Sequence, residues 1–333
     1  MTSQGPRGWT RTAVAIATLG LIALFARSVD WRAAWATVTS ANPTFVLMAV
    51  GANLGSVVIK ALRWRMFLAS VGVPSVSLAF RATLVGAALN NVLFANGGDA
   101  ARVAAVASHA RTASADVLAT LAVDKLCDLA SYAIIFVAVA FALPLPAELA
   151  RWRAPVMSAL GLMFIATVFV VWPARRTVAS PDDVYASFAA RARAYGRRLL
   201  RTLTEVATAP RLAVALLLAV VAWAGQWATF HFAARAAAFP ASPVTSLLAL
   251  MTVNASFLIR LTPGNVGVFQ FLYALAATAA GLDRDGAVAV AILISFIQYI
   301  PVTSIGLVLA STLMWRHEPA TPAPITGQND SRP

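Results

Sequence analysis

The stretch LAVDKLCDLASY, residues 121–132, places two carboxylates and an ammonium group inside an apolar run. Asp124 and Asp128 are four residues apart, so on a helix they share one face, and Lys125 lies beside them. Carboxylates in such a setting need cationic partners, or one of them must be protonated. The candidate cations are Arg81, Arg102 and Lys125. The group is therefore either a salt-bridge cluster that holds helices together or a site for an ion, a proton or a lipid headgroup.

A second stretch, NNVLFANGGDAAR (90–102), ends an apolar run with two glycines, an aspartate and an arginine. Gly97 and Gly98 let the chain turn at low steric cost, and Asp99 is expected to cap the helix that follows. Exposed N–H groups at a helix start attract phosphate, and the planar guanidinium of Arg102 suits phosphate oxygens. In the alternative interpretation, Asp99 only caps and Arg102 extends to the membrane interface.

The third stretch, IRLTPGNVGVFQF (259–271), breaks an apolar run at Pro263, Gly264 and Gly267. Arg260 lies just before this break and far from any loop. Placing an arginine in lipid costs at least about 2.5–3.5 kcal/mol, so Arg260 needs a partner or an aqueous cavity. We expect it to contribute to the same kind of anion site as Arg102.

Composition identifies the class of protein that positions these residues. Of 333 residues, 60% are hydrophobic and 12% charged, and the mean hydropathy is +0.76. A soluble protein cannot bury that much apolar surface, so we predict an all-α integral membrane protein. The net charge of +13 is spread between apolar runs, which favours anionic lipid over nucleic acid as its partner. One cysteine excludes an internal disulfide, and three scattered histidines give no metal-ligand cluster, so we expect no metal and no cofactor.

Apolar segments long enough to span a bilayer indicate about six full transmembrane helices. They lie at 12–27, 43–59, 117–143, 155–173, 211–233 and 287–310, and two further apolar stretches, 76–95 and 244–260, precede the glycine-rich breaks. The segment 174–210 carries seven arginines and is predicted to be an amphipathic or helical loop. Residues 1–316 are expected to form a single membrane domain, followed by a disordered tail at 317–333.

The distribution of basic residues predicts how the breaks cross the membrane. If 76–112 enters and leaves on one side as a re-entrant hairpin, 17 basic residues face the cytoplasm, including Lys60, Arg63 and Arg65, and six lie outside. A single crossing would divide the basic residues between both faces, so the positive-inside rule favours the hairpin with both termini cytoplasmic. The same reasoning makes 244–281 a hairpin that enters from the outside. The alternative is that both breaks are ordinary turns between helices.

Each hairpin is preceded and followed by a span, which gives two oppositely oriented halves at about 43–143 and 211–310. The breaks at Asn96-Gly97 and Pro263-Gly264 are 167 residues apart, half of the chain. Paired breaks in inverted halves are typical of transporters that bind their substrate near the middle of the membrane.

With these residues in view, the chain resembles the lysylphosphatidylglycerol synthase transmembrane-region family, often described as flippase-like. The resemblance covers roughly 12–312. It rests on a G-D/E…R motif, an acidic–basic pair followed by Asp, and a late P-G-x-x-G break. The matching residues are Gly98, Asp99, Arg102, Asp124, Lys125, Asp128, Pro263, Gly264 and Gly267. The chain departs from the family at Ala95-Asn96, where a proline is usual, and at Gln270, where an acidic residue is usual and a proton-coupling role is lost.

The resemblance implies a plasma-membrane protein that moves or handles a lipid with an anionic or polar headgroup. No aminoacyl-transfer domain follows Leu313, so synthase activity is not expected. The leading hypothesis is a lipid translocator without catalytic residues. The alternatives are a membrane-embedded transferase in polyprenyl-lipid, glycolipid or hopanoid metabolism, and a partner that scaffolds a lipid-modifying enzyme. The sequence does not identify the lipid or the oligomeric state.

Overall fold

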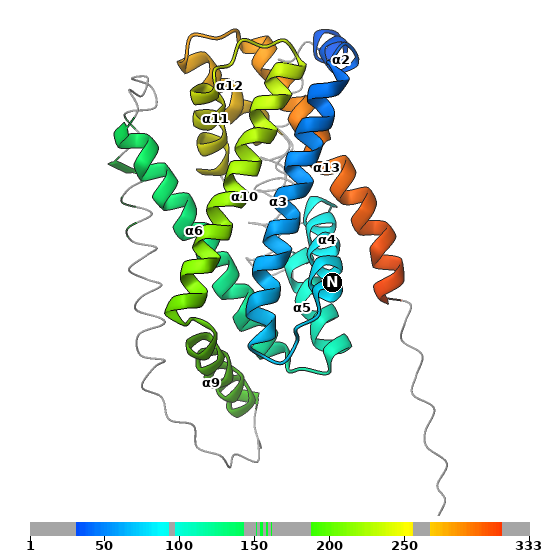
Figure 1. Cartoon of the computed structure of the whole chain (residues 1–333), viewed down its shortest axis with the longest axis vertical. Helices are drawn as coiled ribbons and strands as arrows, with labels where there is room; N and C mark the ends of the chain where they lie inside the picture. Colours follow the sequence, from blue (N-terminus) through cyan, green and yellow to red (C-terminus); the bar gives the residue numbers. More distant parts are fainter. Residues whose placement is uncertain are drawn as a thin grey trace, which may run out of the picture.

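The computed structural model describes residues 31–92, 97–142, 188–255 and 267–314, with five further residues between 151 and 161. In these ranges the chain forms α-helices joined by turns, and no strand occurs among them (Figure 1). The helices are α2 (Trp31–Thr39), α3 (Pro43–Ala69), α4 (Val76–Val92), α5 (Gly97–Ala110), α6 (Ser114–Ala142), α9 (Phe188–Val206), α10 (Ala209–Ala236), α11 (Pro243–Ala255), α12 (Val268–Ala279) and α13 (Arg284–Met314).

Three of these helices, α3, α10 and α13, are long and apolar enough to cross a bilayer. Helix α6 has a similar length of 29 residues, but its first half carries Asp116, Asp124, Lys125 and Asp128. The predicted all-helical membrane fold is confirmed at this level. Of the six predicted spans, 12–27 and most of 155–173 lie outside the described residues.

Helices α3 and α10 lie side by side at the centre of the bundle and run antiparallel (Figure 1). The start of α3 meets the end of α10, where the Asn42 amide donates to the Ala236 carbonyl at 2.9 Å. Gly225 allows the close approach, because a Cβ there would lie 3.1 Å from the Ala52 carbonyl oxygen and 3.2 Å from Ser56 Cβ. Small residues at a contact are the usual means by which membrane helices come together.

A network of side-chain amides joins three helices near the middle of their lengths. Gln226 Nε2 on α10 donates to Asn53 Oδ1 at 3.2 Å and to Ser56 Oγ at 3.0 Å on α3. Gln298 Nε2 on α13 donates to Gln226 Oε1 at 2.9 Å. Polar side chains that pair across helices in this way stabilise the association of apolar spans.

Helices α4 and α5 form an antiparallel pair. The Gly98 amide donates to Asn90 Oδ1 at 2.9 Å, and the backbones cross where Gly86 and Gly98 face each other. The other ends of both helices lie in one apolar cluster with Trp64 and Leu68 near the end of α3. The chain therefore enters and leaves this pair at the same end of the bundle.

Helices α11 and α12 contact each other at the opposite end, in the upper part of Figure 1. Phe239, just after α10, lies against the start of α13, where a Cβ on Gly286 would be 3.0 Å from its ring. The segment that joins α11 to α12, 256–266, lies outside the described residues. Gly267 precedes α12 with a φ of +87°, a left-handed conformation that favours glycine.

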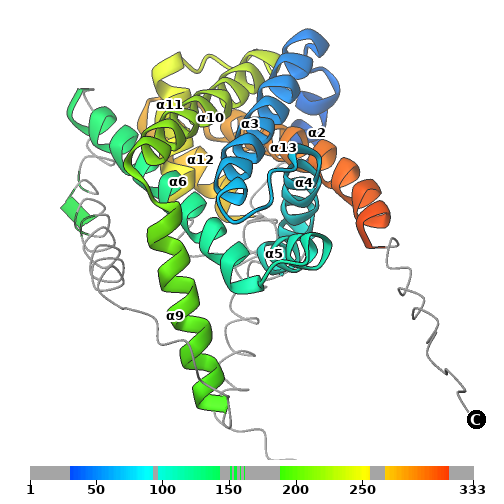
Figure 2. The ribbon, with the colours of Figure 1, turned by 60° about the horizontal axis from the view of Figure 1, so that its bottom comes forward.

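Helix α9 falls within the segment predicted as an amphipathic loop, and it projects from the end of the bundle where α10 begins (Figure 2). Its last turns lie against the bundle, where Leu203 and Val206 join an apolar cluster with Phe67 and Cys127. The exposed Arg198 donates to both Asp116 carboxylate oxygens, with a shortest distance of 2.7 Å. These hydrogen bonds raise the pKa of the Arg198 guanidinium.

One expectation about α3 is wrong. Hydropathy predicts that the span ends at residue 59, directly before the basic residues Lys60, Arg63 and Arg65. Helix α3 instead continues to Ala69, and the Arg63 side chain is fully buried. The apolar face continues through Trp64, Phe67 and Leu68, and burial of these side chains keeps the helix in contact with its neighbours. The basic residues are part of the helix and not of the loop after it.

Candidate functional site

Arg63 is the centre of a buried charge cluster between α3 and α6. Its Nε lies 2.7 Å from Asp124 Oδ1 and its Nη1 lies 2.8 Å from Asp128 Oδ1. Its Nη2 donates to the Asp124 carbonyl at 3.3 Å. One guanidinium therefore binds both carboxylates that the sequence placed on one helix face. A buried arginine with this many charge-assisted hydrogen bonds is well satisfied.

Arg102 on α5 lies beside this centre but is satisfied much less fully. Its guanidinium carbon is 3.6 Å from the centroid of the Trp64 ring, and its Nη2 is 3.8 Å from Asp124 Oδ2. The Trp64 ring is fixed by a hydrogen bond from Nε1 to Thr120 Oγ1 of 3.1 Å. Although the Arg102 side chain is only 8% exposed, its Nε and Nη2 find no hydrogen-bond partner among the described residues. A buried cation therefore has two donors available.

The glycines of the predicted motif explain how Arg102 reaches this place. A Cβ on Gly98 would overlap the Gly86 carbonyl oxygen, and a Cβ on Gly86 would lie 3.1 Å from Arg102 Cβ. Only residues without a side chain allow α5 to approach α4 this closely. Gly97 is the first residue of α5, so the helix starts at the predicted break.

Asp99 does not act as the predicted cap, because α5 begins two residues before it. Its carboxylate instead pairs with Lys125 Nζ at 3.0 Å. The Gly98 amide, one of the groups that a cap would bind, donates to Asn90. Asp99 still lies in the first turn of the helix, where a carboxylate interacts favourably with the helix dipole.

Lys60 adds a fourth cation one turn before Arg63 on α3. It interacts electrostatically with Asp128, and its Nζ lies 5.9 Å from the centroid of the Trp223 ring. Trp223 Nε1 is a further buried donor that has no hydrogen-bond partner within the described part of the chain. The cluster thus combines four cations with three carboxylates. They are Lys60, Arg63, Arg102 and Lys125 with Asp99, Asp124 and Asp128.

The residues predicted around the second break do not all fall in the described ranges. Arg260, Pro263 and Gly264 lie outside them. Gln270 is buried, and its Oε1 accepts from the Gly267 amide at 2.7 Å while its Nε2 donates to Ser295 Oγ at 3.1 Å. This side chain fixes the start of α12 against α13, and both ends of its amide are occupied.

The sequence interpretation missed Lys60, Arg63 and Trp64. The signal that could have found them is their spacing, because 60, 63, 64 and 67 fall on one helix face, as the residues of an apolar or binding stripe do. In the described ranges no three His, Cys, Asp or Glu side chains come together in a group that could hold a metal ion.

Comparison with family models gives a match over residues 10–306 to the family described as "Lysylphosphatidylglycerol synthase TM region". The chain belongs to this family. Neither the curated proteins nor the solved structures gave a match. Membership and the apolar helices together place the protein in a membrane, and the family name connects it with membrane lipids.

Proposed function

We propose that this member of the family is a lipid translocator, which binds the headgroup of an anionic or polar lipid at the charge cluster and moves it across the plasma membrane. The observation that carries the proposal is the Arg102 guanidinium, which is buried with two donor nitrogens, Nε and Nη2, available. Leaving a buried donor without a partner costs about 1–3 kcal/mol, and more for a charged group. A ligand oxygen at these nitrogens would remove that cost.

The surroundings of Arg102 suit a phosphate. The guanidinium offers a planar fork for its oxygens. Arg102 lies in the second turn of α5, whose first residues are Gly97 and Gly98, and the N-terminal end of a helix favours anions. Stacking on Trp64 holds the fork in one plane. In this assignment Asp99, Asp124, Lys125 and Asp128 set the charge of the site, and Arg63 holds the two carboxylates of α6.

The balance of charge favours a ligand with a single negative charge. With all seven side chains of the cluster ionised, four positive and three negative charges leave one positive charge. A phosphodiester headgroup carries one negative charge and would neutralise the cluster. A phosphomonoester, which carries nearly two at this pH, would leave an excess of negative charge in a low-dielectric region.

The helix order supports the inverted halves at about 43–143 and 211–310. Helices α10, α11, α12 and α13 begin 166 to 171 residues after α3, α4, α5 and α6, respectively. The α4–α5 pair is entered from the end where α3 finishes, whereas α11 starts at the other end of the bundle. In this proposal Arg260, Pro263, Gly264, Gly267 and Gln270 belong to the second hairpin, and the breaks of both hairpins meet near the middle of the membrane.

The arginines of α9 support a cytoplasmic position for that end of the bundle. Helix α9 carries Arg191, Arg193, Arg197, Arg198 and Arg201 at this end of the bundle, where anionic headgroups of the inner leaflet would attract them. Both termini are then cytoplasmic. A single membrane domain at 1–316 is part of the same proposal.

The test measures headgroup exchange between leaflets in proteoliposomes that contain a fluorescent phosphatidylglycerol, using a membrane-impermeant quencher. We expect the wild-type protein to accelerate exchange and Arg102→Gln to reduce its rate by about tenfold or more, because one charge-assisted contact is lost. Arg102→Lys should retain only part of the rate, since lysine keeps the charge but not the fork. The matched control is Arg201→Gln, which removes an exposed arginine from α9.

Two results would reject the translocator. One is an unaccelerated exchange for every anionic lipid tested, and the other is an Arg102→Gln variant that folds and transports normally. The competing transferase predicts instead that the purified protein converts a labelled polyprenyl-phosphate donor to product. An accessory protein predicts neither activity alone and requires a lipid-modifying enzyme that copurifies with it.

A further inference from the structure

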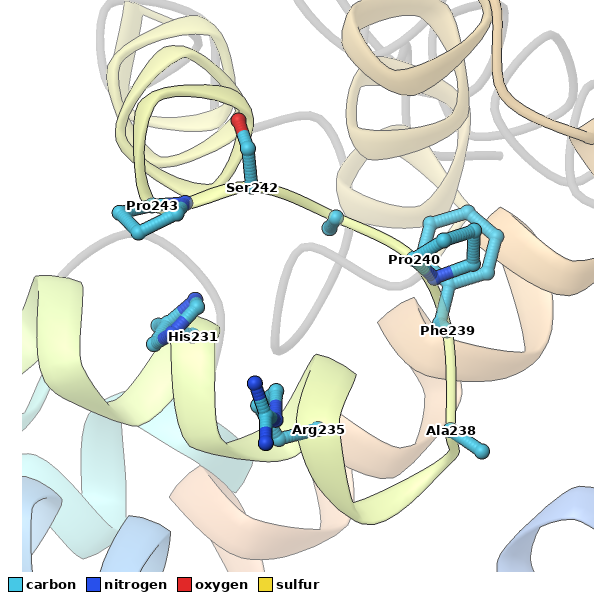
Figure 3. A pocket seen from close by; sticks show the side chains of 8 residues that line it. His231, Arg235, Ala238, Phe239, Pro240, Ser242 and Pro243 are labelled. Atoms are coloured by element: carbon cyan, nitrogen blue, oxygen red, sulfur yellow. The ribbon is translucent and has the colours of Figure 1, made fainter.

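A second polar site lies at the opposite end of the bundle, in the turn between α10 and α11. Here a pocket of about 410 Å³ is lined by the last turns of α10 and the loop that follows it. His231 and Arg235, one turn apart on α10, line the pocket opposite the loop residues 238–243 (Figure 3). We propose that this pocket binds the phosphate of a lipid headgroup in the outer leaflet.

The depth of the pocket matches the headgroup layer. Helix α10 has 28 residues, which at 1.5 Å per residue extend about 42 Å. A bilayer including its headgroups is about 40–45 Å thick. If α10 begins at one headgroup layer, next to α9, the pocket at its other end lies in the second layer. The volume is within the range of about 300–1,000 Å³ that is typical of small-ligand sites.

Arg235 supplies the positive charge. It is exposed, and its guanidinium carbon lies 5.3 Å from the centroid of the Phe45 ring, a cation–π contact that orients the side chain. Within the described ranges no carboxylate forms an ion pair with it. The guanidinium is therefore available to an external anion.

His231 forms the second polar wall. Its Nδ1 lies 3.3 Å from Ser246 Oγ on α11, and its ring stacks on Trp227 with 6.3 Å between the centroids. These contacts fix the orientation of the ring. The contact with Ser246 uses Nδ1 and does not use the other ring nitrogen, Nε2. Trp227 donates to the Pro243 carbonyl at 2.9 Å, which ties α10 to the start of α11. A tryptophan with this arrangement is typical of the membrane–water interface.

The backbone around the pocket opposes an anion less than a bare helix C-terminus would. The carbonyls at the end of α10 would repel one, but those of Ala233, Ala234 and Arg235 accept hydrogen bonds from the amides of residues 237–239. Ser242 Oγ accepts from the Thr245 amide at 3.0 Å and so caps the start of α11, whose positive dipole end borders the pocket. The ligand would contact Arg235 and His231 and would leave Ser242 in its capping role.

The proposal rests on the proposed function in two respects: the phosphate belongs to a lipid, and its leaflet follows from the cytoplasmic position of α9. Binding itself can be measured without transport. Nanodiscs would contain a phosphatidylglycerol analogue with a photoreactive group in its headgroup, and labelled peptides would be identified by mass spectrometry. We expect labelling within 231–243 and about a tenfold reduction in Arg235→Gln, because a charge-assisted contact is lost. Arg235→Lys should keep much of the labelling. Arg284→Gln, an exposed arginine at the same end of the bundle, should leave it unchanged.

Three results would overturn the site. They are an absence of label in 231–243, equal labelling in wild type and Arg235→Gln, and removal of the label by excess inorganic phosphate. The last result would make free phosphate the ligand. Headgroup exchange measured on the same preparation separates the two proposals. Normal exchange without this label would reject only the pocket, whereas label at the pocket without exchange would reject only the translocator.

Discussion

At the scale of single residues, Arg63 and Arg102 have different tasks although they lie in one cluster. Arg63 uses its hydrogen-bonding capacity on Asp124 and Asp128 and is fully buried. Arg102 keeps two donors available and rests on an aromatic ring. A buried pair that loses one member leaves an uncompensated charge, whereas a donor without a partner gains from a ligand. Substitution of Arg63 should therefore lower the stability of the fold, whereas substitution of Arg102 should lower ligand binding and transport.

Arg63→Leu should destabilise the fold strongly. It leaves Asp124 without its closest partner, and breaking a buried ion pair in this way costs about 3–5 kcal/mol. Thermal unfolding of the purified protein in detergent would show a large drop in Tm. Arg198→Leu is the matched control, because its pair with Asp116 is 58% exposed on the arginine side and exposed pairs contribute about 0–1 kcal/mol. Similar losses in both variants would contradict the assignment of Arg63 as a structural centre.

The pairing of these residues is only partly predictable from the sequence. Spacing alone places Asp124 and Asp128 on one face and predicts that they need a cation. It cannot select that cation, because the choice depends on which helix lies opposite α6. The basic run at 60–65 has the composition of a span's end, which assigns Arg63 to the cytoplasm. Only the packing of α3 against α6 shows that its guanidinium binds both carboxylates.

At the scale of helices, the crossing of α4 and α5 depends on the two facing glycines. Gly98→Ala would place its Cβ on the Gly86 carbonyl and 2.7 Å from the Asn90 amide nitrogen, both of which are backbone atoms that cannot move aside. Overpacking of this kind costs about 1–3 kcal/mol. Gly51→Ala and Gly55→Ala on α3 are matched controls, because a Cβ added at either position would meet no atom within 4 Å.

These glycine variants can be compared by their melting temperatures. We expect a lower Tm for Gly98→Ala and an unchanged or slightly higher one for the two controls, since alanine is favoured over glycine in a helix by about 0.5–1 kcal/mol. The Gly98 variant should also lose exchange activity, because Arg102 is carried by the same helix. A Gly98→Ala protein as stable as the wild type would show that the two backbones are not in contact.

Hydropathy predicts the positions of the helices better than their ends. The predicted starts at 43, 76, 117, 211, 244 and 287 lie within three residues of the observed ones. The predicted end of α3 is ten residues early, because charged residues usually mark the interface and here they are buried within the bundle. Amphipathic α9 is expected from its arginines, but its contact with α6 through Asp116 requires the tertiary structure.

At the scale of the whole molecule, the charge cluster lies toward the α9 end of the bundle and the His231–Arg235 pocket lies at the other end. If α9 faces the cytoplasm, the two sites serve opposite leaflets. Single cysteines at exposed positions test this orientation. In right-side-out membrane vesicles, an impermeant maleimide should label Arg284→Cys directly and Tyr195→Cys only after permeabilisation. The reverse pattern would invert the molecule and exchange the leaflets assigned to the two sites.

The native thiol offers an intrinsic reporter of internal motion. Cys127 is covered by Leu203 and Val206, which belong to the last turns of α9. A small permeant alkylating reagent reaches this buried sulfur only when the cluster opens, and separation of α9 from α6 is one such opening. The alkylation rate of the unmodified chain would report how often this opening occurs. Comparing the rate with and without lipid would show whether a bound lipid changes the separation of α9 from α6.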